Sequence, residues 1–258
     1  MSVHQSPASA KFHSGTHLDQ ELARRKMVIS RSQAESYIKL GKVKLNGKIV
    51  TNTAEIVTTT DLIELTATEQ YVSRAALKLD SVAKALRLNF EGKIILDVGS
   101  STGGFTDYAL KHGAVKSIAV EVGTNQLHPS LHNNPQIELH EQTDIRNFQT
   151  SDTIDIVVAD VSFISLREIL PHVAGLSGPK TQIIAMVKPQ FEVNGERTRT
   201  GADIKHKGII KNDRMRRDIL KNFEQWASRY FRIVDKADSA VSGSKGNVER
   251  FYLLVKLK

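Results

Sequence analysis

The sequence predicts an α/β fold: a seven-stranded, mostly parallel, doubly wound sheet, preceded by a small α+β domain. Two observations predict it. From about residue 94 onward, seven apolar strand segments alternate with helical or loop stretches, as in a sheet built from crossover units. A glycine-rich turn directly follows the first segment and leads into a helical pattern. The 258 residues suffice for one large and one small domain. We expect a flexible N-terminus at 1–16, a small domain at 17–66, a linker at 67–72 and the α/β domain at 73–258.

The small domain is expected to hold two helices and three strands. Leu18 and Leu22 share one face of a first helix. Ser32 is expected to cap a second helix, which ends at Gly41. Alternation with period two then predicts three strands, the first two joined by a hairpin turn at Asn46–Gly47, over residues 42–45, 48–50 and 61–65.

In the large domain, a helix over residues 75–86 precedes the strands and a long helix over about 211–230 precedes the last two. The seven predicted strands cover residues 94–98, 117–122, 137–140, 154–160, 182–188, 233–236 and 250–256. A glycine-rich stretch, 242–247, joins the last two, which we expect to form an antiparallel hairpin at the sheet edge.

The turn after the first strand indicates a nucleotide-like ligand. Asp97 ends the strand, and Gly99, Gly103 and Gly104 allow a backbone to approach a ligand closely. These glycines do not have the G-x-G-x-x-G spacing of dinucleotide folds, which disfavours a nicotinamide oxidoreductase. The acid Asp97, followed by a loop that is less suited to phosphates, favours S-adenosylmethionine, because this cofactor has no phosphate groups. A tight turn without a ligand is the alternative.

Polar residues at the other strand ends extend this prediction, because ligands of open α/β sheets bind there. Glu121 can accept hydrogen bonds from ribose hydroxyls, and Asp144 can hold the amine of adenine. Lys188 ends a buried strand, where a lysine is costly unless it is paired, and Asp160 on the neighbouring strand is the expected partner. Taken singly, each could be an ordinary polar strand end.

Charge and composition restrict the partners. The net charge of +8 points to a polyanion, with nucleic acid ahead of a membrane. Residues 24–48 contain eight lysines or arginines and one acid, and residues 194–222 carry a net charge of +5. Either segment could also be an ordinary solvated surface. The absence of cysteine excludes disulfides and thiolate metal sites and fits a cytoplasmic protein, and we expect no metal. We find neither a secretory signal nor an apolar run of the roughly 20 residues that a membrane span needs.

Residues 24–47 resemble the RNA-binding domain first described in ribosomal protein S-four. The resemblance rests on Arg24–Arg25, the run 30–34, Ile38 and the run 41–47. It implies binding to structured RNA. The expected contacts, including one at the start of the next domain, are Arg24, Arg25, Lys26, Arg31, Ser32, Lys42, Lys44 and Arg74.

Five further motifs resemble the TlyA family of ribosomal RNA 2′-O-methyltransferases, which have an RrmJ/FtsJ-like catalytic domain and include members named haemolysins. The motifs are 73–79, 97–106, 159–166, 187–192 and 246–249. The resemblance implies S-adenosylmethionine as cofactor, cytidine as target, ribosomal RNA or a ribosomal subunit as partner, and a catalytic tetrad of Lys78, Asp160, Lys188 and Glu249. The expected cofactor-binding residues are Asp97, Gly99, Ser100, Ser101, Thr102, Gly103, Gly104, Phe105, Glu121, Asp144, Ile145 and Asp160.

The chain departs from that family at two positions. Tyr71 stands where relatives often present tryptophan, and Glu121 stands where aspartate is frequent. For the reaction, two roles of Lys188 remain open: a general base, or a cation that stabilises the developing alkoxide. Rival functions are a non-catalytic RNA-binding or ribosome assembly factor and a membrane-active haemolysin. The intact tetrad argues against the first, and the lack of a suitable amphipathic segment disfavours the second.

Overall fold

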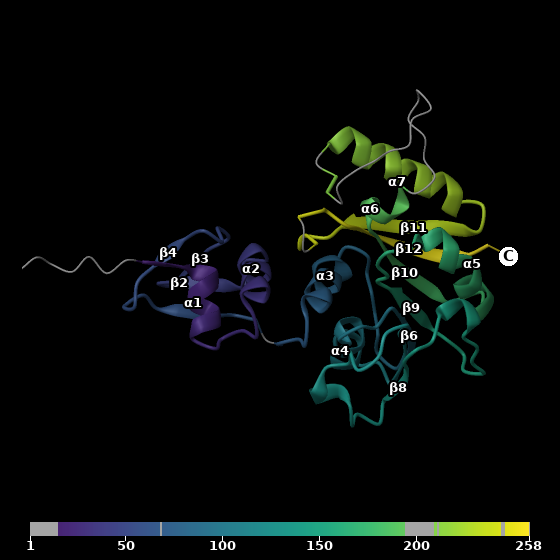
Figure 1. Ribbon diagram of the computed structural model, residues 1–258, viewed down its shortest axis with the longest axis horizontal. Coiled ribbons are helices and arrows are strands. Elements are labelled where there is room, and N and C mark those ends of the chain that lie inside the picture. Colours follow the sequence, from purple (N-terminus) through teal and green to yellow (C-terminus); the bar gives the residue numbers. More distant parts are fainter. Residues whose placement is uncertain (1–14, 68, 194–208, 211, 244–245, 258) are drawn as a thin grey trace, which may run out of the picture. The chain divides into compact units, whose positions relative to one another are not determined.

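The computed structural model describes residues 15–67, 69–193, 209–210, 212–243 and 246–257 (Figure 1). Its internal contacts divide the chain into two units, Met1–Gln70 and Tyr71–Lys258. The division falls within the linker that the sequence predicts at 67–72. Each unit is described by itself.

The described residues of the N-terminal unit form two helices and short strands. Helices α1 (Leu18–Arg24) and α2 (Arg31–Lys39) pack through buried Leu18, Leu22 and Tyr37. A three-stranded sheet joins β2 (Val43–Leu45) to β3 (Lys48–Ile49) and β5 (Ile63–Leu65), and β1 (Thr16–His17) pairs with β4 (Ile56–Val57). The hairpin between β2 and β3 is confirmed. Asn46 and Gly47 have φ of 51° and 80°, as a two-residue type I′ turn requires.

The cap of α2 differs from the prediction. Ser30 is the cap, and its hydroxyl accepts a hydrogen bond from the Gln33 amide at 3.2 Å. The Gln33 side chain in turn accepts from the Ile29 amide at 2.9 Å. The prediction of Ser32 as cap is therefore wrong, because the Ser-x-x-Gln pattern that marks a helix start begins at Ser30.

The C-terminal unit confirms the predicted fold class. Its seven-stranded sheet has the order β11-β12-β10-β9-β6-β7-β8. The strands from β8 to β10 run parallel, and β12 is antiparallel to both of its neighbours. The strands are β6 (Ile94–Val98), β7 (Lys116–Val120), β8 (Ile137–His140), β9 (Ile156–Ala159), β10 (Gln182–Val187), β11 (Phe231–Asp238) and β12 (Arg250–Lys256).

Helices cover both faces of this sheet. Buried residues of α5 (Leu166–Leu176) and α7 (Asp213–Ala227) form one apolar core with the strands. Helices α3 (Arg74–Ala83) and α4 (Gly104–Lys111) pack against each other, and Phe105 contacts Phe251 with ring centroids 6.1 Å apart. The remaining helical segments are α6 (Pro189–Glu192) and the 3₁₀ turns Pro129–Leu131 and Ile145–Asn147. None of the helices described here has the length and apolarity to cross a membrane.

The capping assignment can be tested by removing each serine hydroxyl. We expect Ser30→Ala to destabilise α2 by about 1 kcal/mol, since a helix cap is lost, and the matched Ser32→Ala to have little effect. Native-state hydrogen exchange of the α2 amides in the full chain measures both. Equal effects of the two substitutions would contradict the assignment.

Candidate active site

The site lies where the winding of the sheet reverses. Strand β6 lies between β7 and β9, so the connections that leave β6 and β9 diverge and open a crevice at the carboxyl ends. In the register, Val98 of β6 and Ala185 of β10 both pair with Ala159, and Val187 pairs with Arg250. The residues that precede or follow these positions, Asp97, Asp160, Lys188 and Glu249, therefore lie at the same edge.

All three glycines of the turn lie where a Cβ would clash with protein atoms, and Gly99 also lines a cavity. Gly99 has φ of +78°, and a Cβ there would lie 2.8 Å from the carbonyl oxygen of Asp160. Gly103 has φ of +83°, and its Cβ would collide with Leu127 and Leu131. Gly104 lies against Ser73 of the α3 cap. Gly103 and Gly104 line none of the three cavities described below, and their lack of a Cβ lets α4 start at this position.

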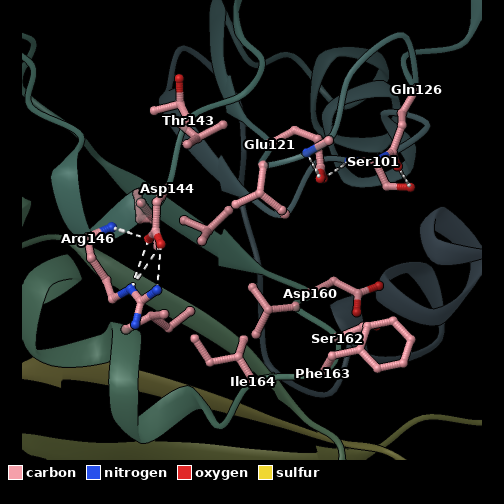
Figure 2. Close-up of a pocket in the computed structure, with 18 residues that line it drawn as sticks. Ser101, Glu121, Gln126, Thr143, Asp144, Arg146, Asp160, Ser162, Phe163 and Ile164 are labelled. Atoms are coloured by element: carbon pink, nitrogen blue, oxygen red, sulfur yellow. Dashed lines mark hydrogen bonds and ion pairs between the residues drawn. The ribbon is translucent and has the colours of Figure 1, made fainter.

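The first cavity, of about 560 Å³, contains much of the predicted cofactor site (Figure 2). Glu121 borders it, and its two carboxylate oxygens accept hydrogen bonds from the amides of Ser101 at 2.9 Å and Gly123 at 2.8 Å. These bonds fix the carboxylate beside the glycine-rich turn. Other predicted residues that line it are Gly99, Ser101, Asp144, Ile145 and Asp160.

Asp144 lies in this cavity but already has a cationic partner. The Arg146 guanidinium donates to both carboxylate oxygens, at 2.6 Å for the closest contact, and holds the pKa of Asp144 below its ordinary value. Arg146 also lines the cavity, as Figure 2 shows on the left. An amine that binds Asp144 would therefore have to share or displace Arg146, which the sequence analysis did not identify.

A smaller cavity of about 140 Å³ is built around Asp97. One carboxylate oxygen accepts from the amide of Thr106 at 3.0 Å and from its hydroxyl at 2.7 Å. The other oxygen is buried and accepts no hydrogen bond from the described residues. Burial raises the pKa of Asp97 from 3.8 to about 7. The remaining lining residues include Ser100, Ser101, Thr102, Phe105, Asp160, Ser162 and Lys188.

The four charged residues of the predicted tetrad come together as two ion pairs. Lys188 Nζ lies 2.5 Å from Asp160 Oδ1 and donates to the Ser162 hydroxyl at 2.8 Å. Lys78 Nζ lies 2.6 Å from Glu249 Oε2. Lys78, Lys188 and Glu249 line a third cavity of about 430 Å³. Lys188 also lines the 140 Å³ cavity, so the two cavities adjoin at this residue.

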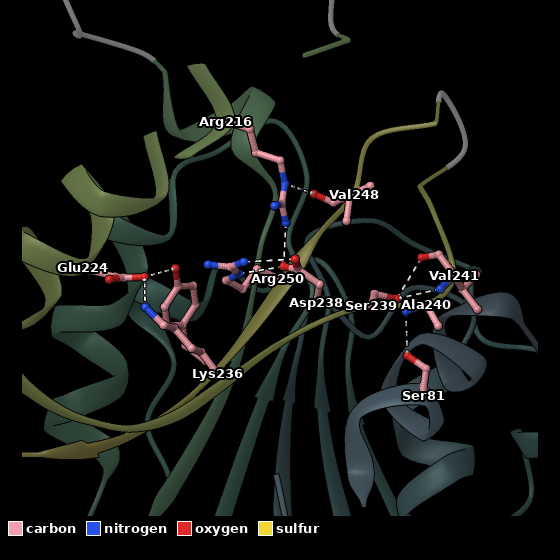
Figure 3. Close-up of polar contacts among 11 residues, drawn as sticks. Ser81, Arg216, Glu224, Lys236, Asp238, Ser239, Ala240, Val241, Val248 and Arg250 are labelled. Carbon is pink, nitrogen blue, oxygen red and sulfur yellow. Dashed lines mark hydrogen bonds and ion pairs between the residues drawn. The ribbon is translucent and has the colours of Figure 1, made fainter. Parts of the chain in front are cut away.

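A polar network outside the cavities holds the start of β12 (Figure 3). Arg216 of α7 donates to the Val248 carbonyl at 3.1 Å and to Asp238 of β11 at 2.6 Å. Asp238 also accepts from Arg250 at 2.6 Å and 3.0 Å. The network therefore fixes the backbone on both sides of Glu249.

Two aromatic residues at the site were missed from the sequence. Phe163 has a left-handed φ of 68° and is 90% exposed, although it lines both large cavities. Its ring centroid lies 5.4 Å from that of Phe191. A bulky exposed residue in this conformation is strained, and such strain is typical of functional sites. Phe163 follows a strand end by a few residues, and this position was the one signal in the sequence.

The predicted RNA contacts of the N-terminal unit divide into two groups. Arg24 and Arg25 bind Glu21 and hold its pKa at about 2, and Arg31 binds Asp19 at 2.6 Å. Glu21 and Asp19 lie outside the segment 24–48 over which the charge was counted. That count therefore overestimated the positive charge that is free to bind RNA. Within the described chain, the other three cations form no ion pair, namely Lys26, Lys42 and Lys44. Ser32 lies in α2 and bonds Ser30 at 3.2 Å.

Two further predictions concern the C-terminal unit. Arg74 lines the 430 Å³ cavity and donates to the Ser242 carbonyl at 2.7 Å. Much of the basic segment at 194–222 lies outside the described residues. Its described part presents Arg214, Arg217 and Lys221 on the exposed side of α7.

The raised pKa of Asp97 predicts a pH-dependent stability. The folded chain binds the Asp97 proton more tightly than the unfolded chain, so this residue costs stability as the pH rises from about 4 to about 7. We expect Asp97→Asn to stabilise the ligand-free protein by roughly 1–3 kcal/mol at pH 8 and by much less at pH 5. Urea denaturation of both proteins at the two pH values measures this. A difference that does not change with pH would contradict the prediction.

Comparison with known proteins shows the family of the chain. The family model described as FtsJ-like methyltransferase matches residues 71–256, and the S4 domain model matches residues 17–63. The chain is 36% identical to the 23S rRNA (cytidine-2′-O)-methyltransferase TlyA of Campylobacter jejuni, over 90% of this chain and 96% of that protein. It is 40% identical to Hemolysin A of Brachyspira hyodysenteriae, over 85% and 91%.

A solved structure of a hemolysin-named protein from Streptococcus thermophilus superimposes with a TM-score of 0.67 at 30% identity, and the match covers 95% of this chain and 90% of that one. The family matches therefore span both units, and the identities extend over most of each relative. The chain belongs to the FtsJ-like methyltransferase family, among the TlyA proteins that carry an S4 domain before the catalytic domain.

Proposed function

We propose that this protein transfers a methyl group from S-adenosylmethionine to the ribose 2′-hydroxyl of a cytidine in ribosomal RNA. One observation carries the proposal: the 140 Å³ cavity shares lining residues with each of the other two. It shares Asp160 and Ser162 with the cavity of about 560 Å³, and Lys188 and Ser162 with the cavity of about 430 Å³. The larger neighbours, of about 560 and 430 Å³, suit a nucleoside-bearing cofactor and an acceptor nucleotide. Their junction is where the methyl group would pass.

The residues present fit this cofactor. The unpartnered oxygen of Asp97 would face the cationic amino-acid end, and the Glu121 carboxylate would accept from the ribose hydroxyls. Gly99 lines the cofactor cavity, and its lack of a Cβ lets the turn approach the Asp160 backbone closely. When bound, S-adenosylmethionine would supply a methyl group on a sulfonium, which is a good leaving group.

Lys188 would act on the acceptor oxygen. Asp160 and Ser162 take up two of the directions in which its ammonium group can donate, so the third is available to the acceptor cavity. There the charge would stabilise the negative charge that develops on the 2′-oxygen as this oxygen bonds the methyl carbon and the carbon–sulfur bond breaks. The hydroxyl proton would pass to water in the acceptor cavity. Lys78 and Glu249 line the same cavity as a second pair and would position the ribose.

The relatives and the N-terminal unit support the acceptor class. The Campylobacter jejuni relative is named for the cytidine 2′-hydroxyl of 23S rRNA. S4 domains bind structured RNA, and Lys26, Lys42 and Lys44 are available for phosphates. Phe163, exposed at the junction of the cavities, would stack on the target base. A ribosomal substrate would place the protein in the cytoplasm.

Removal of the Lys188 charge tests the catalytic role. We expect Lys188→Ala to lower the methylation rate by roughly 10²–10⁴-fold, with cofactor affinity changed only a few-fold. Lys188→Arg keeps the positive charge but cannot serve as a base. An electrostatic role of Lys188 therefore predicts that the arginine variant is more active than the alanine variant. Nucleoside mass spectrometry of ribosomal RNA incubated with cofactor measures 2′-O-methylcytidine.

The exposed Lys84→Ala, at the end of α3, is the matched control and should behave as the wild type. Equal amounts of 2′-O-methylcytidine from the wild type and Lys188→Ala would refute the catalytic assignment. An arginine variant as inactive as the alanine variant at every pH would instead make Lys188 the general base.

The unpaired lysines of the N-terminal unit should contribute to RNA affinity through phosphates. We expect the double variant Lys42→Ala, Lys44→Ala to bind ribosomal RNA more weakly and to reduce the slope of log affinity against log salt by about 1 for each phosphate that it no longer neutralises. Filter binding at several salt concentrations measures this. Lys180→Ala, an exposed lysine of the other unit, is the control, and an unchanged slope in the double variant would contradict the assignment.

A further inference from the structure

A buried polar atom at the 430 Å³ cavity, the carboxamide oxygen of Gln190, has no role in the proposed reaction. Gln190 of α6 lines this cavity, two residues after Lys188. Its carboxamide oxygen is buried and accepts no hydrogen bond from the described residues. A buried acceptor without a donor costs stability, and folded proteins rarely retain one unless a ligand can supply the donor.

The surroundings of Gln190 restrict what that ligand can be. The rings of Phe163 and Phe191, with centroids 5.4 Å apart, border the same cavity and offer apolar faces to a planar group. Lys188 and Ser162 mark the place of the acceptor hydroxyl. A base attached to that ribose would therefore lie beside the aromatic rings, with its polar edge within reach of α6.

The chemistry of a primary amide favours one pyrimidine over the other. The amide presents an acceptor oxygen beside a donor NH₂ group. Cytosine presents its 4-amino donor beside the N3 acceptor, so the two edges match. Uracil presents the O4 acceptor beside N3–H. Its O4 would therefore lie against the amide oxygen, because that oxygen occupies the enclosed position, and two acceptors repel each other.

We propose that Gln190 reads the base of the acceptor nucleotide, with its carboxamide oxygen accepting from the 4-amino group of cytosine. This rests on the proposed function, because the acceptor cavity is assigned there. Gln190 then selects cytidine over uridine, whereas Lys188, which acts on the ribose, does not distinguish the two bases.

Ribosomal subunits that carry either cytidine or uridine at the methylated position test the proposal. We expect the wild type to methylate the cytidine subunits at least roughly 10-fold faster. Gln190→Leu should lose roughly 10- to 100-fold on cytidine, bring the cytidine-to-uridine ratio close to one and leave cofactor affinity unchanged. Gln190→Glu keeps an acceptor in place and should keep the preference for cytidine. Gln225→Leu, an exposed glutamine of α7, is the control.

Retention of the wild-type ratio by Gln190→Leu, at any overall rate, would overturn the proposal, because a merely structural glutamine would affect both substrates equally. A second readout separates this from the proposed function. In an NMR titration, cytidine 5′-monophosphate should bind the wild type more tightly than uridine 5′-monophosphate, and Gln190→Leu should abolish the difference. If the wild type methylates neither subunit, the proposed function fails, and the titration alone supports or overturns the role of Gln190.

Discussion

The C-terminal unit depends on four charges that share one edge of the sheet and satisfy one another. Lys188 and Asp160 are 10% and 16% exposed in their side chains, and Lys78 and Glu249 are 10% and 3% exposed. Charges at such depth are tolerated when each has a partner, and removal of one partner leaves the other uncompensated. The strand register brings the pairs together, and the Arg216–Asp238–Arg250 network holds the backbone that carries Glu249.

Other polar groups at the same edge have no partner within the described chain. One oxygen of Asp97, the Ser100 hydroxyl and the Gln190 carbonyl oxygen are buried without a hydrogen bond, and all three lie at the two smaller cavities. A chain selected for stability alone would pair or remove these groups. Under the proposed function, bound molecules would complete this hydrogen bonding, so that occupancy of the site would also stabilise the fold.

The sequence predicted the strands and helices, which local patterns determine. It did not predict contacts between residues that are distant in the sequence. Apolar strand segments identified all seven strands. The strand ends predicted that Asp97, Asp160 and Lys188 lie together, and these residues do line one cavity, because parallel strands place their carboxyl ends together. The pairing of Arg31 with Asp19 was missed because the partner lies 12 residues away in another helix. The sequence did not show that Leu127 and Ser73 occupy the space beside Gly103 and Gly104, whose contact with a ligand stays a prediction.

The position of β12 in the sheet determines when, relative to synthesis, the sheet can finish folding. This strand lies between β10 and β11 in the sheet but follows both in the sequence. During synthesis, the ribosome releases the cofactor crevice and Lys188 well before residues 250–256. The sheet therefore retains an open position until its last strand inserts, and that insertion also delivers Glu249 to Lys78. Insertion of β12 therefore completes the sheet and the charged site in the same step.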